Sequence, residues 1–222
     1  MTKYLQREGY LINHKKVYRI MGNASLLKPG ARIKSSGARK FVRFRKVKTK
    51  YPLECLEMDI KMIWIPNIGK NAYLFSVIDV HSRRILAYRF KMSIKKDIVI
   101  NVLSDIIETY KLPEHVVIRS DNGSQFIANN VREYLSLVGI QQEFTHVATP
   151  EENAHIEAFH GTLKRDVLDR VEYTSFEYIN QVINRYINFY NNSRLHGLLG
   201  GITPMEKWDK DKNLIPIAQK AA

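Results

Sequence analysis

The sequence has one cysteine and no long apolar segment, and each shortage excludes a class of protein. Cys55 is alone among 222 residues, so an internal disulfide and a cysteine-rich zinc site are excluded. No apolar run approaches the ~20 residues that a membrane-spanning helix needs. Residues 1–10 contain no apolar signal-peptide core. We therefore expect a protein of a reducing compartment with no membrane partner.

Acidic residues are almost missing from the first part of the chain. Residues 1–50 hold 15 Lys and Arg and one acid, a net charge of +14, whereas the remaining 20 (35 − 15) basic residues face 21 (22 − 1) acids. This asymmetry predicts a polyanion-binding arm at residues 1–50, with a membrane surface as the lesser alternative. It also predicts a near-neutral domain at 51–210 and a frayed tail at 211–222.

The basic arm divides into a short helix and a linker. Asn13 can cap a helix whose apolar side includes Val17, with basic residues on the other side. Residues 22–50 are rich in Gly, Ser and Lys and predict a flexible basic segment. Phosphate contact is expected, with a merely solvated basic surface as the alternative. The expected contacts are Lys15, Lys16, Arg19, Arg39, Lys40, Arg43 and Arg45.

The near-neutral domain begins with strand patterns. From Leu56 to Trp64, apolar residues alternate with Glu57, Asp59 and Lys61, which predicts a strand with Asp59 on the face opposite the apolar set. A turn at 67–71, strands at 72–78 and 84–90, and a helix at 95–110 follow. Periodicity alone supports a mixed α/β fold.

Two further carboxylates occupy distinctive positions. Asp121 follows a β-branched run and opens the turn D-N-G-S, so it lies at the C-terminal end of a predicted strand, where α/β sheets place ligands. A helix is then predicted from Thr149 as N-cap, Pro150 at N1 and Glu152 at N3, a capping box. At about 100° per residue, Asn153, Glu157 and Lys164 share one stripe. Glu152 instead is expected to face solvent or cap the helix.

The pattern D-N-G-S-Q-F, followed by N-A-x-x-E-x-F-x-x-x-L-K, resembles the integrase-core (DDE, retroviral-integrase-like) transposases of two-reading-frame insertion sequences, as their second-frame product. The resemblance covers roughly residues 10–208. N-H-K-K-V-Y-R-I-M, from Asn13 to Met21, is similar to the last helix of the DNA-binding module that precedes this core. The preceding helices of that module are not recognisable, so Met1 is interpreted as a truncation or an internal start.

The resemblance implies an α/β, RNase H-like fold: a mixed five-stranded sheet flanked by helices, plus the basic helical arm. It implies a DNA transposase or integrase that cleaves phosphodiesters and transfers strands between element ends and target DNA, in the cytoplasm of a bacterial-type cell and near its nucleoid. It implies catalysis by Asp59, Asp121 and Glu157, which hold Mg²⁺ or Mn²⁺, expected as two ions. Lys164, Asn122 and Asn153 would contact DNA, and a homo-oligomer would bring two ends together.

Several alternatives stay open at this point. Asp79 also ends an apolar strand and competes with Asp59, although a turn-stabilising role is favoured. A zinc site of His155, Glu157 and His160 is disfavoured, because the two histidines are five residues apart rather than four. Arg194 and His196 are expected to be structural rather than DNA contacts. The rival functions are an RNase H-like nuclease without strand transfer and a non-catalytic DNA-binding regulator.

Overall fold

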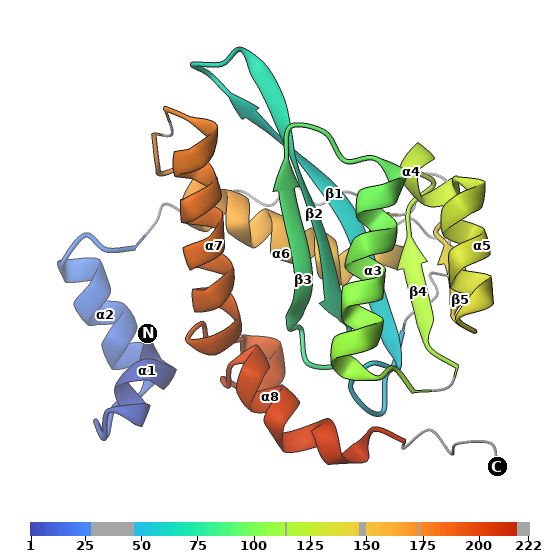
Figure 1. Cartoon of the computed structure of the whole chain (residues 1–222). Helices are drawn as coiled ribbons and strands as arrows, with labels where there is room; N and C mark the ends of the chain where they lie inside the picture. Colours follow the sequence, from blue (N-terminus) through green and yellow to red (C-terminus); the bar gives the residue numbers. More distant parts are fainter. Residues whose placement is uncertain (28–46, 114, 147–149, 173, 217–222) are drawn as a thin grey trace.

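The computed structural model describes residues 1–27, 47–113, 115–146, 150–172 and 174–216 (Figure 1). The strands are β1 (Cys55–Ile65), β2 (Lys70–Asp79), β3 (Ile85–Lys91), β4 (Val117–Ser120) and β5 (Gln141–Phe144). The α-helices are α1 (Thr2–Arg7), α2 (His14–Asn23), α3 (Lys96–Tyr110), α4 (Ser124–Ile127), α5 (Asn129–Leu137), α6 (Ala154–Leu163), α7 (Phe176–Asn192) and α8 (Pro204–Asp211). Short 3₁₀ turns lie at η1 (Pro150–Asn153), η3 (Gly197–Leu199) and η4 (Lys212–Leu214), and a π-helical turn at η2 (Lys164–Leu168).

One mixed sheet of five strands organises the domain, in the order β3-β2-β1-β4-β5. The first three strands form an antiparallel meander, and β4 and β5 add in parallel beside β1. The predicted mixed five-stranded sheet flanked by helices is therefore confirmed. Within the described residues, no helix combines the length and apolar character needed to cross a bilayer.

Helices cover both faces of the sheet, and each face has its own core. Leu56 and Met58 of β1 face the side covered by α3, α4 and α5, where α8 adds Trp208. Ile63 and Ile65 of β1 pack on the other side, among residues of α6 and α7. Side chains two apart on a strand share a face, so Glu57 and Asp59 also point toward the α6 side.

The outer half of β1 departs from the predicted alternation. Ile63 and Ile65 are buried, whereas Met62 and Trp64 are more than half exposed, at 57% and 53%. The β1–β2 hairpin extends beyond the helices on the α3 side (Figure 1). The apolar face predicted for this strand is therefore buried at Leu56 and Met58 but exposed at Met62 and Trp64.

The structure confirms the N-cap predicted for α2 and corrects the N-cap predicted for α7. Asn13 caps α2 as predicted, since its side chain accepts a hydrogen bond from the Lys16 amide at 2.9 Å. For α7, the spacing of Thr174 and Glu177 in the sequence predicts a capping box with Thr174 as the N-cap, and this prediction is wrong. Ser175 is the N-cap, and its Oγ accepts from the Tyr178 amide at 3.1 Å.

An unpredicted helix, α1, precedes α2 and contacts the C-terminal part of the domain. Arg7 pairs with Glu206 of α8 at 2.8 Å, and the Tyr4 hydroxyl donates to the Ser193 carbonyl. Both partners of the Arg7 pair are well exposed, so the pair contributes little stability. Helix α1 thus brings the start of the chain to the segment after α7.

Candidate active site

The strand register brings the first two predicted carboxylates to the same edge of the sheet. Strands β1 and β4 are parallel, with Glu57 opposite Arg119 as the last paired residues. Continuing the register by two residues places Asp59 opposite Asp121. Neighbouring strands lie about 4.8 Å apart, so these carboxylates belong to one local environment.

The pKa of Asp121 reflects both its partial burial and the nearby charge of Asp59. Partial burial raises the pKa of Asp121, and the nearby charge of Asp59 raises it further, while a hydrogen bond from the Gly123 amide at 3.0 Å acts in the opposite direction. A carboxylate whose pKa is raised by a neighbouring carboxylate marks a place where a cation would be stabilised. Asp59 and Asp121 are therefore close enough for their charges to interact.

Helix α6 docks its first two turns directly on β1. The buried Asn153, just before the helix, donates from Nδ2 to the Met58 carbonyl at 3.3 Å. Two turns further on, the buried His160 contacts Asp59 (Nδ1–Oδ2, 3.2 Å) and Ser76 of β2 (Nε2–Oγ, 2.9 Å). The helix is thus held on the backbone and side chains that surround Asp59.

Glu157 lies between these two docking residues on the helix surface. It is four residues after Asn153 and three before His160, which are neighbouring positions on a helix. Its side chain is exposed and lies in the first turn of α6. The chain therefore carries the third carboxylate on the element that packs against Asp59.

The donor chemistry of this region fits a hard divalent cation. Carboxylate oxygens are the ligands that Mg²⁺ and Mn²⁺ prefer. The buried Asn153 Oδ1 has no hydrogen-bond donor in the described part of the chain. Across the described ranges, however, no three His, Cys, Asp or Glu side chains lie close enough together to hold a metal ion. The structure thus brings Asp59 and Asp121 near each other and carries Glu157 on the helix that contacts Asp59, without a closed metal cluster among the described residues.

The predicted start of α6 needs a correction. A 3₁₀ turn covers Pro150–Asn153, and the α-helix begins at Ala154. Glu152 does not face solvent: it is 3% exposed, and its carboxylate accepts from the His146 amide at 2.9 Å. Thr149, the predicted N-cap, lies outside the described residues.

The predicted DNA-contacting residues have varied surroundings. Asn122 donates to the Thr145 carbonyl at 3.0 Å and so joins the ends of β4 and β5. Lys164 is exposed and forms an ion pair with Asp169. On α2, Lys15, Lys16 and Arg19 are all exposed. The remaining contacts, Arg39, Lys40, Arg43 and Arg45, lie outside the described residues.

The two alternative sites are accounted for by other contacts. Asp79 is fully buried and accepts from the amides of Leu53 (2.9 Å) and Ser82 (2.8 Å), which is the turn-stabilising role favoured by the sequence. In the alternative zinc site, both ring nitrogens of His160 bond to Asp59 and Ser76. His155 instead bonds to Glu57, so the two histidines serve different partners.

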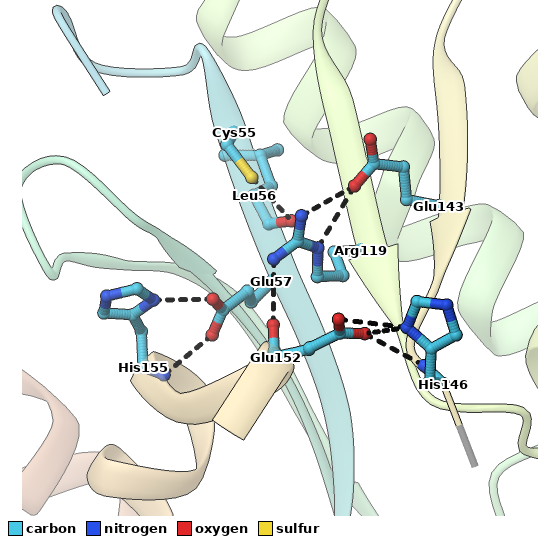
Figure 2. A network of polar contacts seen from close by, with 8 residues as sticks. All are labelled: Cys55, Leu56, Glu57, Arg119, Glu143, His146, Glu152 and His155. Atoms are coloured by element: carbon cyan, nitrogen blue, oxygen red, sulfur yellow. Dashed lines mark hydrogen bonds and ion pairs between the residues drawn. The ribbon is translucent and has the colours of Figure 1, made fainter. Parts of the chain in front are cut away.

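Sequence reasoning missed a polar network built around the buried Glu57, Arg119 and Glu152, shown in Figure 2. It consists of Glu57, Arg119, Glu143, His146, Glu152 and His155. Burial at this network also raises the pKa of the Cys55 thiol to about 12. The available signal was the period-2 pattern, which puts Glu57 on the same face as Asp59. A polar residue on a strand is ordinarily assigned to solvent, so its burial was not foreseen.

Two family models, each described as an integrase core domain, match residues 50–150 and 138–204. Together they span the sheet, α6 and most of the segment after it. The chain belongs to the integrase-core family. The predicted membership is thus confirmed, and it implies polynucleotidyl transferase activity.

The relatives of this integrase-core chain are transposases of insertion sequences. It is 29% identical over 217 residues to the putative transposase InsK for insertion sequence element IS150 of Escherichia coli, covering 93% of this chain and 75% of the relative. It is 26% identical over 215 residues to the transposase for insertion sequence element IS904 of Lactococcus lactis, covering 93% of this chain and 84% of the relative. The predicted function, a DNA transposase catalytic chain, is confirmed at this level.

Solved integrases share the fold. The catalytic core domain of HTLV-2 integrase, solved in complex with magnesium, matches with a TM-score of 0.56 and 16% identity, over 72% of this chain and 98% of that one. A chain of the simian T-cell lymphotropic virus intasome matches with a TM-score of 0.64 and 14% identity, over 82% of this chain and 62% of that one. The predicted RNase H-like fold is confirmed.

Proposed function

We propose that this chain cleaves and joins DNA strands at a site formed by Asp59, Asp121 and Glu157 with two divalent cations, Mg²⁺ or Mn²⁺. The observation that carries the proposal is the shared location of these residues in an integrase-core fold. Asp59 lies in β1 and Asp121 directly follows β4, the parallel neighbour of β1, while α6 packs against β1 with Glu157 in its first turn.

The chain's residues have separate tasks in this proposal. Asp59 and Asp121 hold the cations between them, which relieves the repulsion that raises the pKa of Asp121. Glu157 completes the ligand set from α6. When bound, such ions activate water or a 3′-hydroxyl and stabilise the leaving oxygen of an in-line displacement. Hydrolysis would free a 3′ end, and that hydroxyl would then attack a target phosphodiester.

DNA contact is assigned to basic residues outside the carboxylate site. Lys164 follows α6 and would hold a phosphate near the reacting strand after exchanging its partner Asp169. Lys15, Lys16 and Arg19 on α2 would bind backbone phosphates with the arm at 1–50, ahead of the core at 51–210. Asn122 and Asn153 would shape the site edges. Because two element ends must meet, the active form would be a homo-oligomer on DNA in a bacterial-type cytoplasm.

The test is a joining assay with a recessed 3′ DNA end, a target duplex and Mg²⁺ or Mn²⁺. We expect Asp121→Asn and Glu157→Gln to abolish joined product while leaving DNA binding nearly unchanged. Glu177→Gln is the matched control, because Glu177 also lies exposed in a helix first turn, that of α7. Joining that survives both substitutions would remove the proposal. Cleavage without joining would favour a nuclease, and DNA binding alone a regulator.

A further inference from the structure

A layer of buried polar residues lies directly behind the three proposed ligands. Each member stands two residues before a carboxylate: Glu57 before Asp59, Arg119 before Asp121, and His155 before Glu157. Glu57 and Arg119 are register partners on β1 and β4, and Glu57 bonds to His155. Residues two apart on a strand point the same way, so the anchors and the strand ligands follow one another along the same face.

Glu57 caps helix α6 from the neighbouring strand. Its side chain is fully buried, and Oε2 accepts from the backbone amides of His155 and Ile156, both at 2.9 Å. Oε1 contacts His155 Nδ1 at 2.6 Å (Figure 2). First-turn amides have no partner within their own helix, and a carboxylate at this end also interacts favourably with the positive end of the helix dipole. Asn153 occupies the N-cap position but makes no side-chain cap bond, so Glu57 takes its place.

Arg119 holds the same segment from the other side. Its guanidinium is 6% exposed, and Nη1 donates to the Glu152 carbonyl at 3.0 Å. Nη2 donates to Glu143 of β5 at 2.7 Å, which fixes the plane of the guanidinium. The Glu152 carboxylate in turn contacts His146 Nδ1 at 3.0 Å. The turn before α6 is therefore bonded to Met58 of β1, to Arg119 of β4 and to His146, which is two residues after β5.

The free-energy cost of burying charged side chains here indicates that they serve to position the helix. Burying a carboxylate and a guanidinium is unfavourable unless every oxygen and N–H is bonded, and apolar residues could hold the helix as stably. What charged groups add is a fixed direction and spacing. A metal site requires its ligands to be set by supporting hydrogen bonds to a fraction of an ångström.

We propose that Glu57 and Arg119 are positioning residues that fix where α6 presents Glu157 relative to Asp59 and Asp121. The inference rests on the proposed function, since it concerns how that site is assembled. It adds a role for two residues that touch neither DNA nor metal. It also explains why the start of α6 is bonded to Glu57 and Arg119, which stand two residues before Asp59 and Asp121.

The test compares Glu57→Ala and Glu57→Gln with Asp79→Ala. Asp79 is an equally buried carboxylate that also accepts backbone amides, but its partners are Leu53 and Ser82 rather than α6. Three quantities are measured for each folded variant: thermal stability, metal-free hydrogen exchange at the amides of residues 155–156, and Mn²⁺ affinity with the joining rate.

For Glu57→Ala we expect faster exchange at residues 155–156 and a loss of about 10–100-fold in Mn²⁺ affinity or joining. Glu57→Gln keeps an amide acceptor and should recover most of that loss. Asp79→Ala should lower stability while leaving exchange at these amides and Mn²⁺ affinity unchanged. If Glu57→Ala does not fold, Glu57→Gln carries the test. A neutral carboxamide oxygen is a weaker acceptor than the carboxylate oxygen that now serves both amides, so their exchange should still rise.

Unchanged exchange at residues 155–156 in the Glu57 variants would overturn the proposal, as would an equal loss of Mn²⁺ affinity in Asp79→Ala. The exchange measurement needs neither metal nor DNA. It therefore decides the anchoring role even if the unaltered chain joins no DNA, an outcome that would count against the proposed function alone.

Discussion

His196 should make the stability of the fold depend on pH in a defined window. Its ring lies edge-on to Tyr190, with centroids 4.7 Å apart, in the segment that follows α7. Burial, together with the smaller effect of the cationic Arg194 and Arg83, lowers the pKa of His196 from the usual 6.5 to about 4. Between about pH 4 and 6.5, the imidazole of His196 is therefore neutral in the folded state, whereas in the unfolded chain it takes up a proton as the pH falls below 6.5.

The sign and size of the effect follow from these pKa values. Because the folded pKa is depressed, the stability from His196 is complete above pH 6.5 and is lost as the pH falls from 6.5 toward 4. At about 1.4 kcal/mol per pH unit, the loss is about 3 kcal/mol. Since the ring keeps some solvent access, about 2 kcal/mol is a reasonable expectation.

Urea unfolding at a series of pH values between 4 and 8 measures this dependence. His196→Gln should flatten the curve in that window, because glutamine takes up no proton. His14→Gln is the control, since His14 is exposed on α2 and should leave the slope unchanged. Parallel curves for the unaltered chain and His196→Gln would refute the assignment. A neutral His196 would support a structural role for this segment over a phosphate contact.

Two further predictions concern the cap of α7 and the basic arm. Ser175→Ala should lower the free energy of unfolding by about 1 kcal/mol, whereas Thr174→Ala should change it little, because only Ser175 accepts the Tyr178 amide; equal losses in chemical denaturation would contradict the observed cap. Deleting residues 1–50 removes a charge of +14 and should weaken DNA binding and flatten its dependence on salt, and an unaltered slope in a titration series would show that the arm does not bind phosphate.

The sequence was sufficient for features that depend on local periodicity. Alternation placed Asp59 in mid-strand, opposite the apolar face, and the structure has it there beside Ser76. The D-N-G turn placed Asp121 just beyond a strand, which the structure also shows. These positions could be predicted because a strand's side chains alternate regardless of what covers each face.

Features that depend on what lies across the sheet could not be predicted. Alternation cannot say where a covering helix ends, so it gave no sign that Met62 and Trp64 would be exposed while Leu56 and Met58 on the same face are buried. Glu57 looked like an ordinary solvent-facing residue of a strand. Its burial follows from the docking of α6, nearly a hundred residues later in the chain, and no local pattern encodes that contact.

The N-terminal caps distinguish helices that would keep their cap bonds if they shifted as a unit from a helix that would lose them. Helices α2 and α7 are capped by their own Asn13 and Ser175, so each N-terminus stays satisfied if the helix shifts as a unit. At the N-terminus of α6, the amides of His155 and Ile156 instead bond to Glu57 of another element. Any shift of α6 along β1 therefore exposes its first amides without acceptors, at a cost of about 1–3 kcal/mol for each buried amide. The one helix that carries a proposed metal ligand is thus the helix whose position the strand beside it dictates.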